Sequence, residues 1–357
     1  MLKVALDGRR LQDDPPGGVG RTLREILGPL AELVELSLLY DRRRPVPPFP
    51  GATPHGLAGL GPLPETGWLQ LSTPVWLGRH RPDVFHGTFN AIPLLCPARS
   101  VVSIYDLAWK HHPEDLGAAK RRLFAAHAAW AAGHSEIIVT VSEFTRAAII
   151  DTYRVPGDRV VVVPPARPVR FGPERAASVD PLLQRLGIRR PFVVAIGGAR
   201  RRGLAVAVAA WQAATADLGA DRPQLVVVGR EPPPAGTDLV GTGPLDDPSW
   251  AALLAAAEVL CYPTRYEGFG LPALEAAASG TPVVCAPVGS LPEVLGEAGG
   301  WAASPSVDDM ATVLHRIITD SAARQALADA GLARASAWPA TTAVAGVMAD
   351  VYERAAA

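Results

Sequence analysis

The stretch Val259–Cys285, VLCYPTRYEGFGLPALEAAASGTPVVC, contains a complete strand–loop–helix–strand unit. Val259–Tyr262 is a short apolar run of the kind that forms a buried parallel strand. Pro272 suits the first turn of a helix, where its missing N–H costs no hydrogen bond, and Gly280 suits the left-handed position after the helix. A second apolar run follows at Pro282–Cys285. This unit predicts a parallel sheet covered by helices.

Similar apolar runs, each followed by a turn and a helical stretch, recur along the chain and predict successive βαβ units. The pattern is interrupted at Pro164–Pro181, which is rich in proline and arginine as a connector between domains would be. Pro45–Pro64 is rich in proline and glycine and is expected to be a surface loop. The runs interpreted as strands are Leu2–Leu6, Val34–Tyr40, Val101–Ile104, Ile137–Val141, Val160–Val163, Phe192–Ile196, Leu225–Val228, Val259–Tyr262 and Pro282–Cys285.

The pattern therefore predicts an α/β protein with two doubly wound parallel-sheet domains. We place the N-terminal domain in residues 1–170, the C-terminal domain in residues 171–335 and a final helix within residues 336–357. The length of 357 residues agrees with two domains, because one hydrophobic core rarely extends over so long a chain.

Composition narrows the class of protein. Apolar residues make up 48% and charged residues 19%, as in a well-packed globular protein. The net charge of -1 argues against nucleic acid as the principal partner. The three cysteines lack a Cys-x-x-Cys pair, so they indicate neither a disulfide framework nor a zinc site. No apolar run reaches membrane-spanning length and the start lacks a signal-peptide core, so we expect a cytoplasmic protein.

The candidate site is the glycine-rich turn between Glu267 and Glu275. Backbone N–H groups at the helix start would attract an anion, while the two carboxylates would accept hydrogen bonds from hydroxyl groups. A ligand that is part phosphate and part polyol, such as a nucleotide sugar, has both features. In the alternative interpretation, Glu275 complements the helix dipole and Glu267 is a solvated loop residue. The turn consists of Gly268, Phe269, Gly270 and Leu271.

The string EGFGLPALE followed by GTPVV resembles the E-x7-E segment of the retaining family-4 glycosyltransferases, group 1 enzymes that include mannosyltransferases. Further motifs occur in the order found in this family: PPGGVGRTLREIL near the start, VTVSEFTRAAI from residue 139, and VVAIGGARRRGL from residue 193. The resemblance covers most of the chain. It implies the GT-B fold, in which two Rossmann-like domains face each other across a cleft and the last helix crosses back to the first domain.

By this resemblance, several residues would bind the donor. Gly17 and Gly18 would let the backbone approach the donor phosphates, and Arg201 and Arg202 would bind the pyrophosphate, although arginine replaces the usual lysine. Glu275 would hold the ribose hydroxyls and Glu267 the donor sugar. Gly198 stands where some relatives have an arginine, so Arg200 could take that role. Without the glutamate pair, three consecutive arginines would be interpreted as a solvated turn.

The acceptor side departs from the family pattern. Many relatives have His-Asp at the strand end where this chain has Tyr105 and Asp106. Either Asp106 or His86, which follows another expected strand, would make the missing contact, or the contact is absent. A structural role is the commoner one for a lone histidine at a strand end. The resemblance makes the first domain the acceptor side.

The resemblance implies a hexosyltransferase that moves a sugar from a UDP- or GDP-linked donor to a small-molecule, glycan or lipid-linked acceptor with retention of configuration. By the same resemblance, the departing phosphate would help to deprotonate the acceptor. Arginines and backbone amides would meet the charge of the leaving pyrophosphate, so neither a metal nor another cofactor is expected, and no Asp-x-Asp is present. The alternatives are a non-catalytic nucleotide-sugar-binding protein and a GT-B epimerase. The basic run Lys120–Arg122 begins an expected helix and indicates peripheral membrane contact at most, or simply a solvated surface.

Overall fold

The computed structural model describes residues 1–14, 17–46, 48–59, 64–231, 233, 236 and 238–357. These residues form two compact units, each built around one sheet. The first unit contains Met1–Ala166 and Pro339–Ala357, and the second contains Arg167–Trp338. The domain boundaries predicted from the sequence, after residues 170 and 335, lie a few residues from the two boundaries between these units.

The first unit has a seven-stranded sheet in the order β3-β2-β1-β4-β5-β6-β7, in which every neighbouring pair is parallel. Its strands are β1 Lys3–Asp7, β2 Glu35–Asp41, β3 Ala52–Leu57, β4 Val84–Gly87, β5 Arg99–Ser103, β6 Ile137–Thr140 and β7 Val160–Val162. Its helices are α1 Gly18–Leu33, α2 Pro64–Gly67, α3 Thr73–His80, α4 Ala108–His111, α5 Ala118–His134, α6 Glu143–Tyr153 and the C-terminal α14 Thr341–Ala356.

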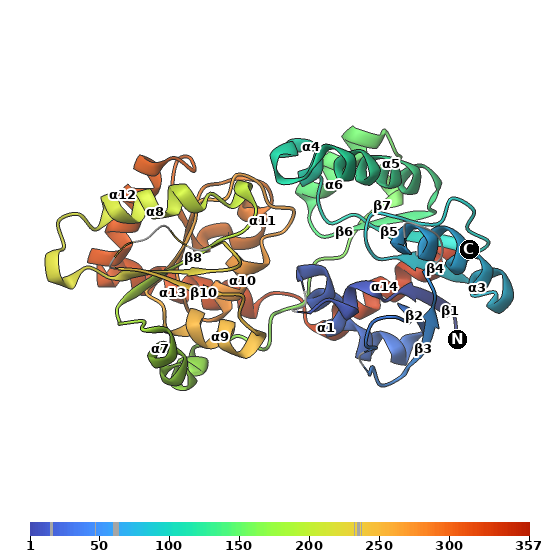
Figure 1. Ribbon diagram of the computed structural model, residues 1–357, viewed down its shortest axis with the longest axis horizontal. Coiled ribbons are helices and arrows are strands. Elements are labelled where there is room, and N and C mark those ends of the chain that lie inside the picture. Colours follow the sequence, from blue (N-terminus) through green and yellow to red (C-terminus); the bar gives the residue numbers. More distant parts are fainter. Residues whose placement is uncertain (15–16, 47, 60–63, 232, 234–235, 237) are drawn as a thin grey trace. The chain divides into compact units, whose positions relative to one another are not determined.

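Helices cover both faces of this sheet because side chains alternate along each strand. Val4 and Leu6 of β1 belong to a buried cluster that also contains residues of α1 and α14. Ala5, between them, belongs to a separate cluster with residues of α3, α5 and α6. The helix α14, drawn in red in Figure 1, packs along α1. The end of the chain is therefore part of the core of the first unit.

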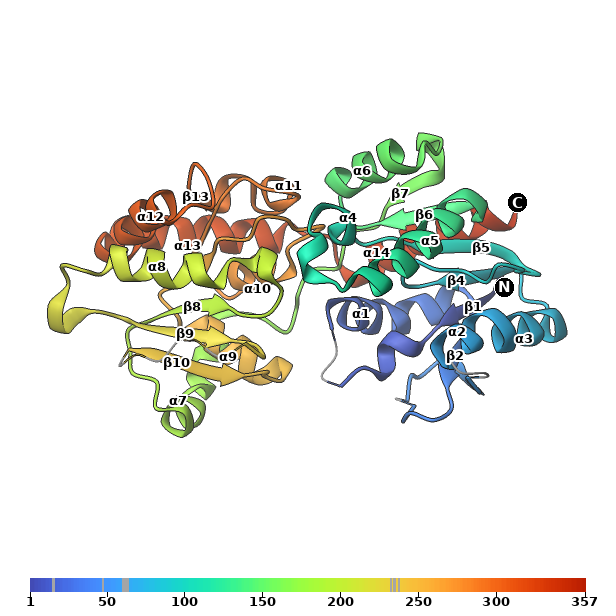
Figure 2. The same ribbon diagram turned by 45° about the horizontal axis from the view of Figure 1, so that its top comes forward.

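The second unit has a six-stranded parallel sheet in the order β10-β9-β8-β11-β12-β13. Figure 2 shows β8, β9 and β10 side by side. One buried cluster joins the sheet to α7, α9, α10 and α11, and a second joins it to α8 and α12. Its strands are β8 Phe192–Ile196, β9 Gln224–Val228, β10 Leu239–Gly243, β11 Val259–Tyr262, β12 Val283–Cys285 and β13 Gly299–Trp301. Its helices are α7 Asp180–Leu186, α8 Leu204–Ala214, α9 Asp247–Ala256, α10 Leu271–Ala278, α11 Leu291–Leu295, α12 Val307–Thr319 and α13 Ser321–Ser336.

The predicted α/β class and both Rossmann-like sheets are confirmed, the nine runs interpreted as strands all form strands, and the strand expected before His86 is β4. The prediction of a loop over Pro45–Pro64 is wrong at Ala52–Leu57, which forms the edge strand β3. Residues 47 and 60–63 of that segment lie outside the described residues. β10 and β13 were not predicted either. Across the described part of the chain, no helix has both the length and the apolar character needed to span a membrane.

Candidate functional site

The predicted donor-binding residues of the second unit follow two adjacent strands. β8 leads into the turn Arg200–Arg202, and β11, which pairs with β8, leads into the loop before α10. The two loops are hydrogen-bonded, because the Arg265 N–H donates to the Arg201 carbonyl at 2.8 Å. Gly203 has a φ of +70°, and a Cβ there would lie 2.4 Å from the Pro263 carbonyl oxygen. The close approach of the two loops thus requires glycine at this position.

Glu267 lies half-buried in the loop between β11 and α10. Its Oε1 accepts a hydrogen bond from the Tyr262 hydroxyl at 2.5 Å, and its backbone carbonyl accepts from Ser290 N and Oγ, each at 3.1 Å. Gly289, with a φ of +59°, allows this approach, since a Cβ there would lie 2.4 Å from the same carbonyl oxygen. Glu267 is therefore held by its neighbours and is not a freely solvated loop residue.

Thr264 joins the arginine turn to Glu267, because its Oγ1 lies 3.4 Å from the Arg201 carbonyl oxygen and 3.5 Å from Glu267 Oε1. Burial raises the pKa of Tyr262 well above its usual value and the Glu267 charge raises it further, whereas Arg202 and Arg201 lower it. Both guanidinium charges therefore act on Tyr262, which donates to Glu267. The Nε of Arg202 is buried and has no hydrogen-bond partner among the described residues. The structure thus brings the Arg200–Arg202 turn and Glu267 together, and their binding of a donor stays a prediction.

Helix α10 begins at the glycine-rich turn. Gly270 precedes it with a φ of +92°, and a Cβ there would lie 2.6 Å from Leu291 Cδ2. Among the residues that the structure describes, no side chain caps the first turn of this helix. Phe269 is buried and packs edge-to-face on Trp338, with ring centroids 5.6 Å apart. The backbone of Gly268–Leu271 therefore lies at the positive end of a helix, where an anion is favoured.

Glu275 is buried in the packing layer between α10 and α9. Its side chain is 4% exposed, and Oε2 accepts a hydrogen bond from the Trp250 indole N–H at 2.7 Å. The helix has no acidic residue in its first turn, so the alternative of a first-turn glutamate that complements the dipole is wrong. A carboxylate so far out of water is stabilised by such a charge-assisted bond.

The remaining predicted residues belong to the first unit. Gly17 is the residue before α1 and Gly18 its first residue, while Pro15 and Pro16 of the same motif lie outside the described residues. A Cβ on Gly17 would meet no described residue within 4 Å, so packing against the described part of the unit does not require glycine there. Asp106 follows β5 and its Oδ1 accepts from the Ala108 N–H at 2.9 Å. Next to it, burial raises the pKa of Tyr105 to about 12.

The prediction that His86 touches substrate does not agree with its position. His86 lies inside β4, not after it, and is 0% exposed. Its Nδ1 lies 2.7 Å from the Tyr352 hydroxyl and its Nε2 lies 2.8 Å from Ser103 Oγ. Burial lowers the pKa of His86 to about 4, partly offset by the charge of Asp7. Both ring nitrogens are thus engaged inside the core, which is the structural role left open as the alternative.

Comparison with known proteins covers both units. The family model described as Glycosyltransferase Family 4 matches residues 16–169, and that described as Glycosyl transferases group 1 matches residues 190–320. The chain belongs to the group 1 glycosyltransferases. Fold and motif order agree with this membership, which makes the protein a sugar-transferring enzyme of the GT-B class.

Individual relatives of this glycosyltransferase differ in the share of their length that matches this chain. O-antigen chain mannosyltransferase B of Escherichia coli is 29% identical over 280 residues, which are 73% of this chain and 72% of that protein. Several other curated glycosyltransferases match over half of their own length or less. Sucrose-phosphate synthase of Thermosynechococcus elongatus has a TM-score of 0.78 at 19% identity, with 99% of this chain and 98% of that chain covered. HepE of Anabaena, crystallised with UDP-glucose, has a TM-score of 0.72 at 16% identity, with 98% and 99% covered.

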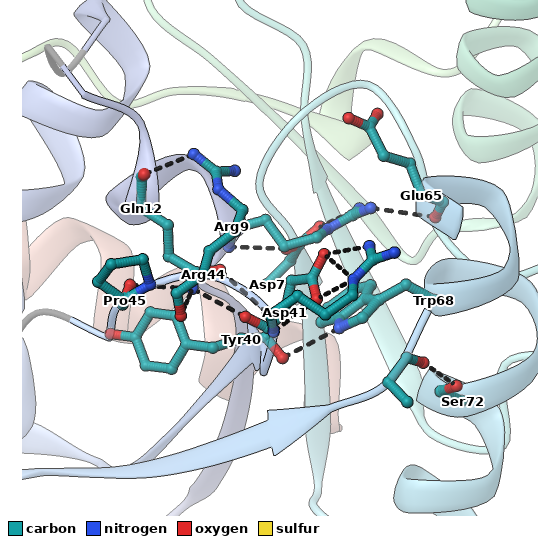
Figure 3. Close-up of polar contacts among 12 residues, drawn as sticks. Asp7, Arg9, Gln12, Tyr40, Asp41, Arg44, Pro45, Glu65, Trp68 and Ser72 are labelled. Carbon is teal, nitrogen blue, oxygen red and sulfur yellow. Dashed lines mark hydrogen bonds and ion pairs between the residues drawn. The ribbon is translucent and has the colours of Figure 1, made fainter. Parts of the chain in front are cut away.

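The glycosyltransferase also has a cavity of about 550 Å³ in its first unit, which we did not predict. Two equivalent ion pairs form one wall of it. At the end of β1, Arg9 makes a bidentate pair with Asp7, and at the end of β2, Arg43 makes the same pair with Asp41. Figure 3 shows the first pair beside Trp68, whose ring centroid lies 4.1 Å from the Arg9 guanidinium carbon.

Buried Gln12 holds the two strand-end loops of this cavity together (Figure 3). Its side-chain nitrogen lies 3.0 Å from the carbonyl oxygens of Asp41, Arg44 and Pro45, and its Oε1 accepts from the Asp41 N–H. The sequence contains a signal for this cavity, because β1 and β2 each end in Asp-x-Arg-Arg. Since the two strands are parallel neighbours, the two motifs lie at one edge of the sheet.

Proposed function

We propose that this glycosyltransferase takes a sugar from a nucleoside-diphosphate donor and transfers it to a hydroxyl group of an acceptor. The main support is the cluster at the ends of β8 and β11. There the turn that carries Arg201 and Arg202 is hydrogen-bonded to the loop that carries Glu267, beside a helix start that no described side chain caps. Positive groups and an acid therefore occur together, as a ligand with both phosphates and hydroxyls requires. The crystal structure of HepE in complex with UDP-glucose supports a donor of this class.

In this proposal, each group has one task. Arg201, Arg202 and the backbone amides of Gly268–Leu271 stabilise the charge that develops on the leaving pyrophosphate. Glu267 binds the donor sugar, and its hydrogen bond from Tyr262 fixes the carboxylate in one orientation. Glu275 accepts from the ribose hydroxyls while Trp250 holds its other side. Gly17 and Gly18, at the start of α1, approach the donor phosphates.

The acceptor would bind in the first unit, with Asp106 near the transferred sugar. His86 has no part in this proposal because it is enclosed in the core. We further propose retention of the anomeric configuration, activity without a metal ion and a cytoplasmic location, with membrane contact at most peripheral. The charge of the donor is met by arginines and amides, so no metal is needed for that purpose.

Calorimetric titration with a panel of UDP- and GDP-sugars, followed by a turnover assay, tests the proposal. Glu275→Gln keeps an oxygen for the Trp250 N–H and removes the charge. We expect this variant to lower kcat/KM for the donor by roughly 1.5 to 3 kcal/mol, or about ten- to a hundredfold. Glu297→Gln, a change at an exposed glutamate of the same unit, is the matched control.

The outcomes separate the alternatives. Unchanged donor use by Glu275→Gln would refute the assignment of this residue. Donor binding without turnover would indicate a non-catalytic protein, and conversion of the donor sugar without an acceptor would indicate an epimerase. Proton NMR of the product at its anomeric centre reports retention or inversion directly.

A further inference from the structure

The cavity of the first unit lies where a parallel sheet offers a ligand site. Its walls include residues that follow β1, β2 and β4 at their carboxyl ends, together with residues of α5. In the order β3-β2-β1-β4-β5, strands β2 and β3 lie on one side of β1, and strands β4 and β5 lie on its other side. The direction in which successive strands are added therefore reverses between β1 and β4. Such a switch point, at the carboxyl ends of the strands, is the usual ligand site of open α/β sheets.

One residue of the cavity has an unsatisfied polar group. Asn90 is 6% exposed, and its Oδ1 has no hydrogen-bond partner among the described residues. Its φ of 55° lies in the left-handed region, which is uncommon for any residue except glycine. A buried polar atom without a partner is costly in a folded protein, and backbone conformations of this kind gather at ligand sites. Asn90 is therefore positioned to hydrogen-bond a ligand.

Two of the four arginines of the cavity keep donor groups available. Arg9 and Arg43 are committed to Asp7 and Asp41. The guanidinium carbon of Arg10 lies 4.1 Å from the ring centroid of Phe89, and within the described part of the chain it makes no hydrogen bond. Its single ion pair there is with Asp13, at 3.5 Å.

Arg44 approaches the same carboxylate from the other side. Its Nη2 donates to the Gln12 carbonyl oxygen and also lies 3.0 Å from Asp13 Oδ1, whereas Arg10 Nη1 lies 3.5 Å from Asp13 Oδ2. The Asp13 side chain is 29% exposed, so both guanidinium groups meet it at the surface of the molecule and not in the core. Two guanidinium groups that converge on one carboxylate have the spacing to hold a planar or tetrahedral anion of similar size.

We propose that the acceptor of this enzyme is a hydroxylated molecule with an anionic group, a phosphate or a carboxylate, that binds Arg10 and Arg44 in place of Asp13. Asn90 and the carboxylate of Glu65, which also lines the cavity, bind its hydroxyl groups. This inference rests on the proposed function, because it names the class of acceptor. It also places the acceptor next to the strand end that carries Asp106, since the Asn90 N–H donates to the carbonyl oxygen of Ser103, the last residue of β5, at 2.9 Å.

Binding without a donor tests the inference in the full-length protein. Glucose 6-phosphate, glucuronate and glucose are titrated separately, so that phosphate, carboxylate and neutral probes are compared on one sugar scaffold. We expect both charged sugars to bind about tenfold or more tightly than glucose, and the difference to shrink at high salt. If glucose binds as tightly as glucose 6-phosphate and glucuronate, the inference is overturned.

Single substitutions locate the site. Arg10→Gln and Arg44→Gln should each weaken binding of the charged sugars about tenfold. Asp13→Asn should strengthen it, because it removes the competing carboxylate while the fold keeps both arginines. Arg99→Gln is the control, since Arg99 pairs with Glu136 at the amino end of β5. Unchanged binding in both arginine variants, or weaker binding in Asp13→Asn, would overturn the inference.

Hydrolysis of the donor by water separates this inference from the proposed function. Arg99→Gln, the control, should hydrolyse a nucleotide sugar at the wild-type rate and keep its affinity for the charged sugars. If the wild-type enzyme hydrolyses the donor but shows no preference for charged sugars, the inference fails and the proposed function stands. If charged sugars bind and no donor is turned over, the proposed function fails instead.

Discussion

Acid should destabilise the first unit through His86. The imidazole is enclosed between Ser103 and Tyr352, and burial lowers its pKa from 6.5 to about 4. Between these two values the unfolded chain binds a proton at this residue and the folded chain does not. The free energy of unfolding therefore falls as the pH decreases through this window, and His86 adds no pH dependence above or below it.

The magnitude follows from the two pKa values. A difference between 6.5 and about 4 corresponds to about 3 kcal/mol. Above the unfolded-state pKa of 6.5, this contribution to the free energy of unfolding is present in full. It is lost once the pH has fallen to the folded-state pKa of about 4. This is a large part of the stability of an ordinary domain, about 5–15 kcal/mol.

NMR titration of the His86 ring protons measures the folded-state pKa, and urea denaturation over a pH series measures its effect on stability. His86→Asn should be less stable than the wild type near neutrality, and the difference should narrow by about 3 kcal/mol toward acid. Tyr352→Phe leaves the burial of the imidazole in place, so it should keep most of the pH dependence. A measured pKa close to 6.5, or a constant difference between wild type and His86→Asn, would refute this reasoning.

Three further predictions concern the second unit. Trp250→Phe removes the indole donor to Glu275 and should raise the donor KM about tenfold with a smaller change in kcat; steady-state kinetics that show a loss only in kcat would contradict a positioning role. Gly289→Ala should cost about 1–3 kcal/mol of stability, because its Cβ would meet the Glu267 carbonyl oxygen in a left-handed backbone conformation, and an unchanged Tm would speak against this. Sugar transfer should continue in EDTA, since Arg201 and Arg202 meet the pyrophosphate charge; a strict requirement for Mg²⁺ or Mn²⁺ would exclude the metal-free mechanism.

Most of the fold could be predicted because the inner strands are continuous apolar runs. The strands that were not predicted lie at sheet edges, where one neighbour is missing and fewer side chains are buried. β3 contains Pro54 and has no fully buried residue, and β13 is only three residues long, of which two are glycines. Local patterns of hydrophobicity carry little information about such strands.

The residues of the candidate site also differ in how far the sequence could predict them. Glu267, the glycine-rich turn and Glu275 were recognised because they are adjacent in the sequence. The partners of His86 are 17 and 266 positions away, so its enclosure could not be inferred from its neighbours. The cavity wall combines Asp7–Arg10 with Asp41–Arg44, which only the pairing of β1 with β2 brings together. The repeated Asp-x-Arg-Arg at adjacent strand ends would have indicated it.

The return of α14 to the first unit has a practical consequence for dissecting the protein. The second unit is one uninterrupted segment, Arg167–Trp338, so a gene fragment encoding it is a natural candidate for separate expression. The first unit is not: a fragment that stopped at Ala166 would leave bare the face of the sheet that Val344, Met348 and Tyr352 cover. Ligand studies on the isolated first unit therefore call for a fusion in which a short linker joins Ala166 to Pro339, or for co-expression with the terminal helix as a separate peptide.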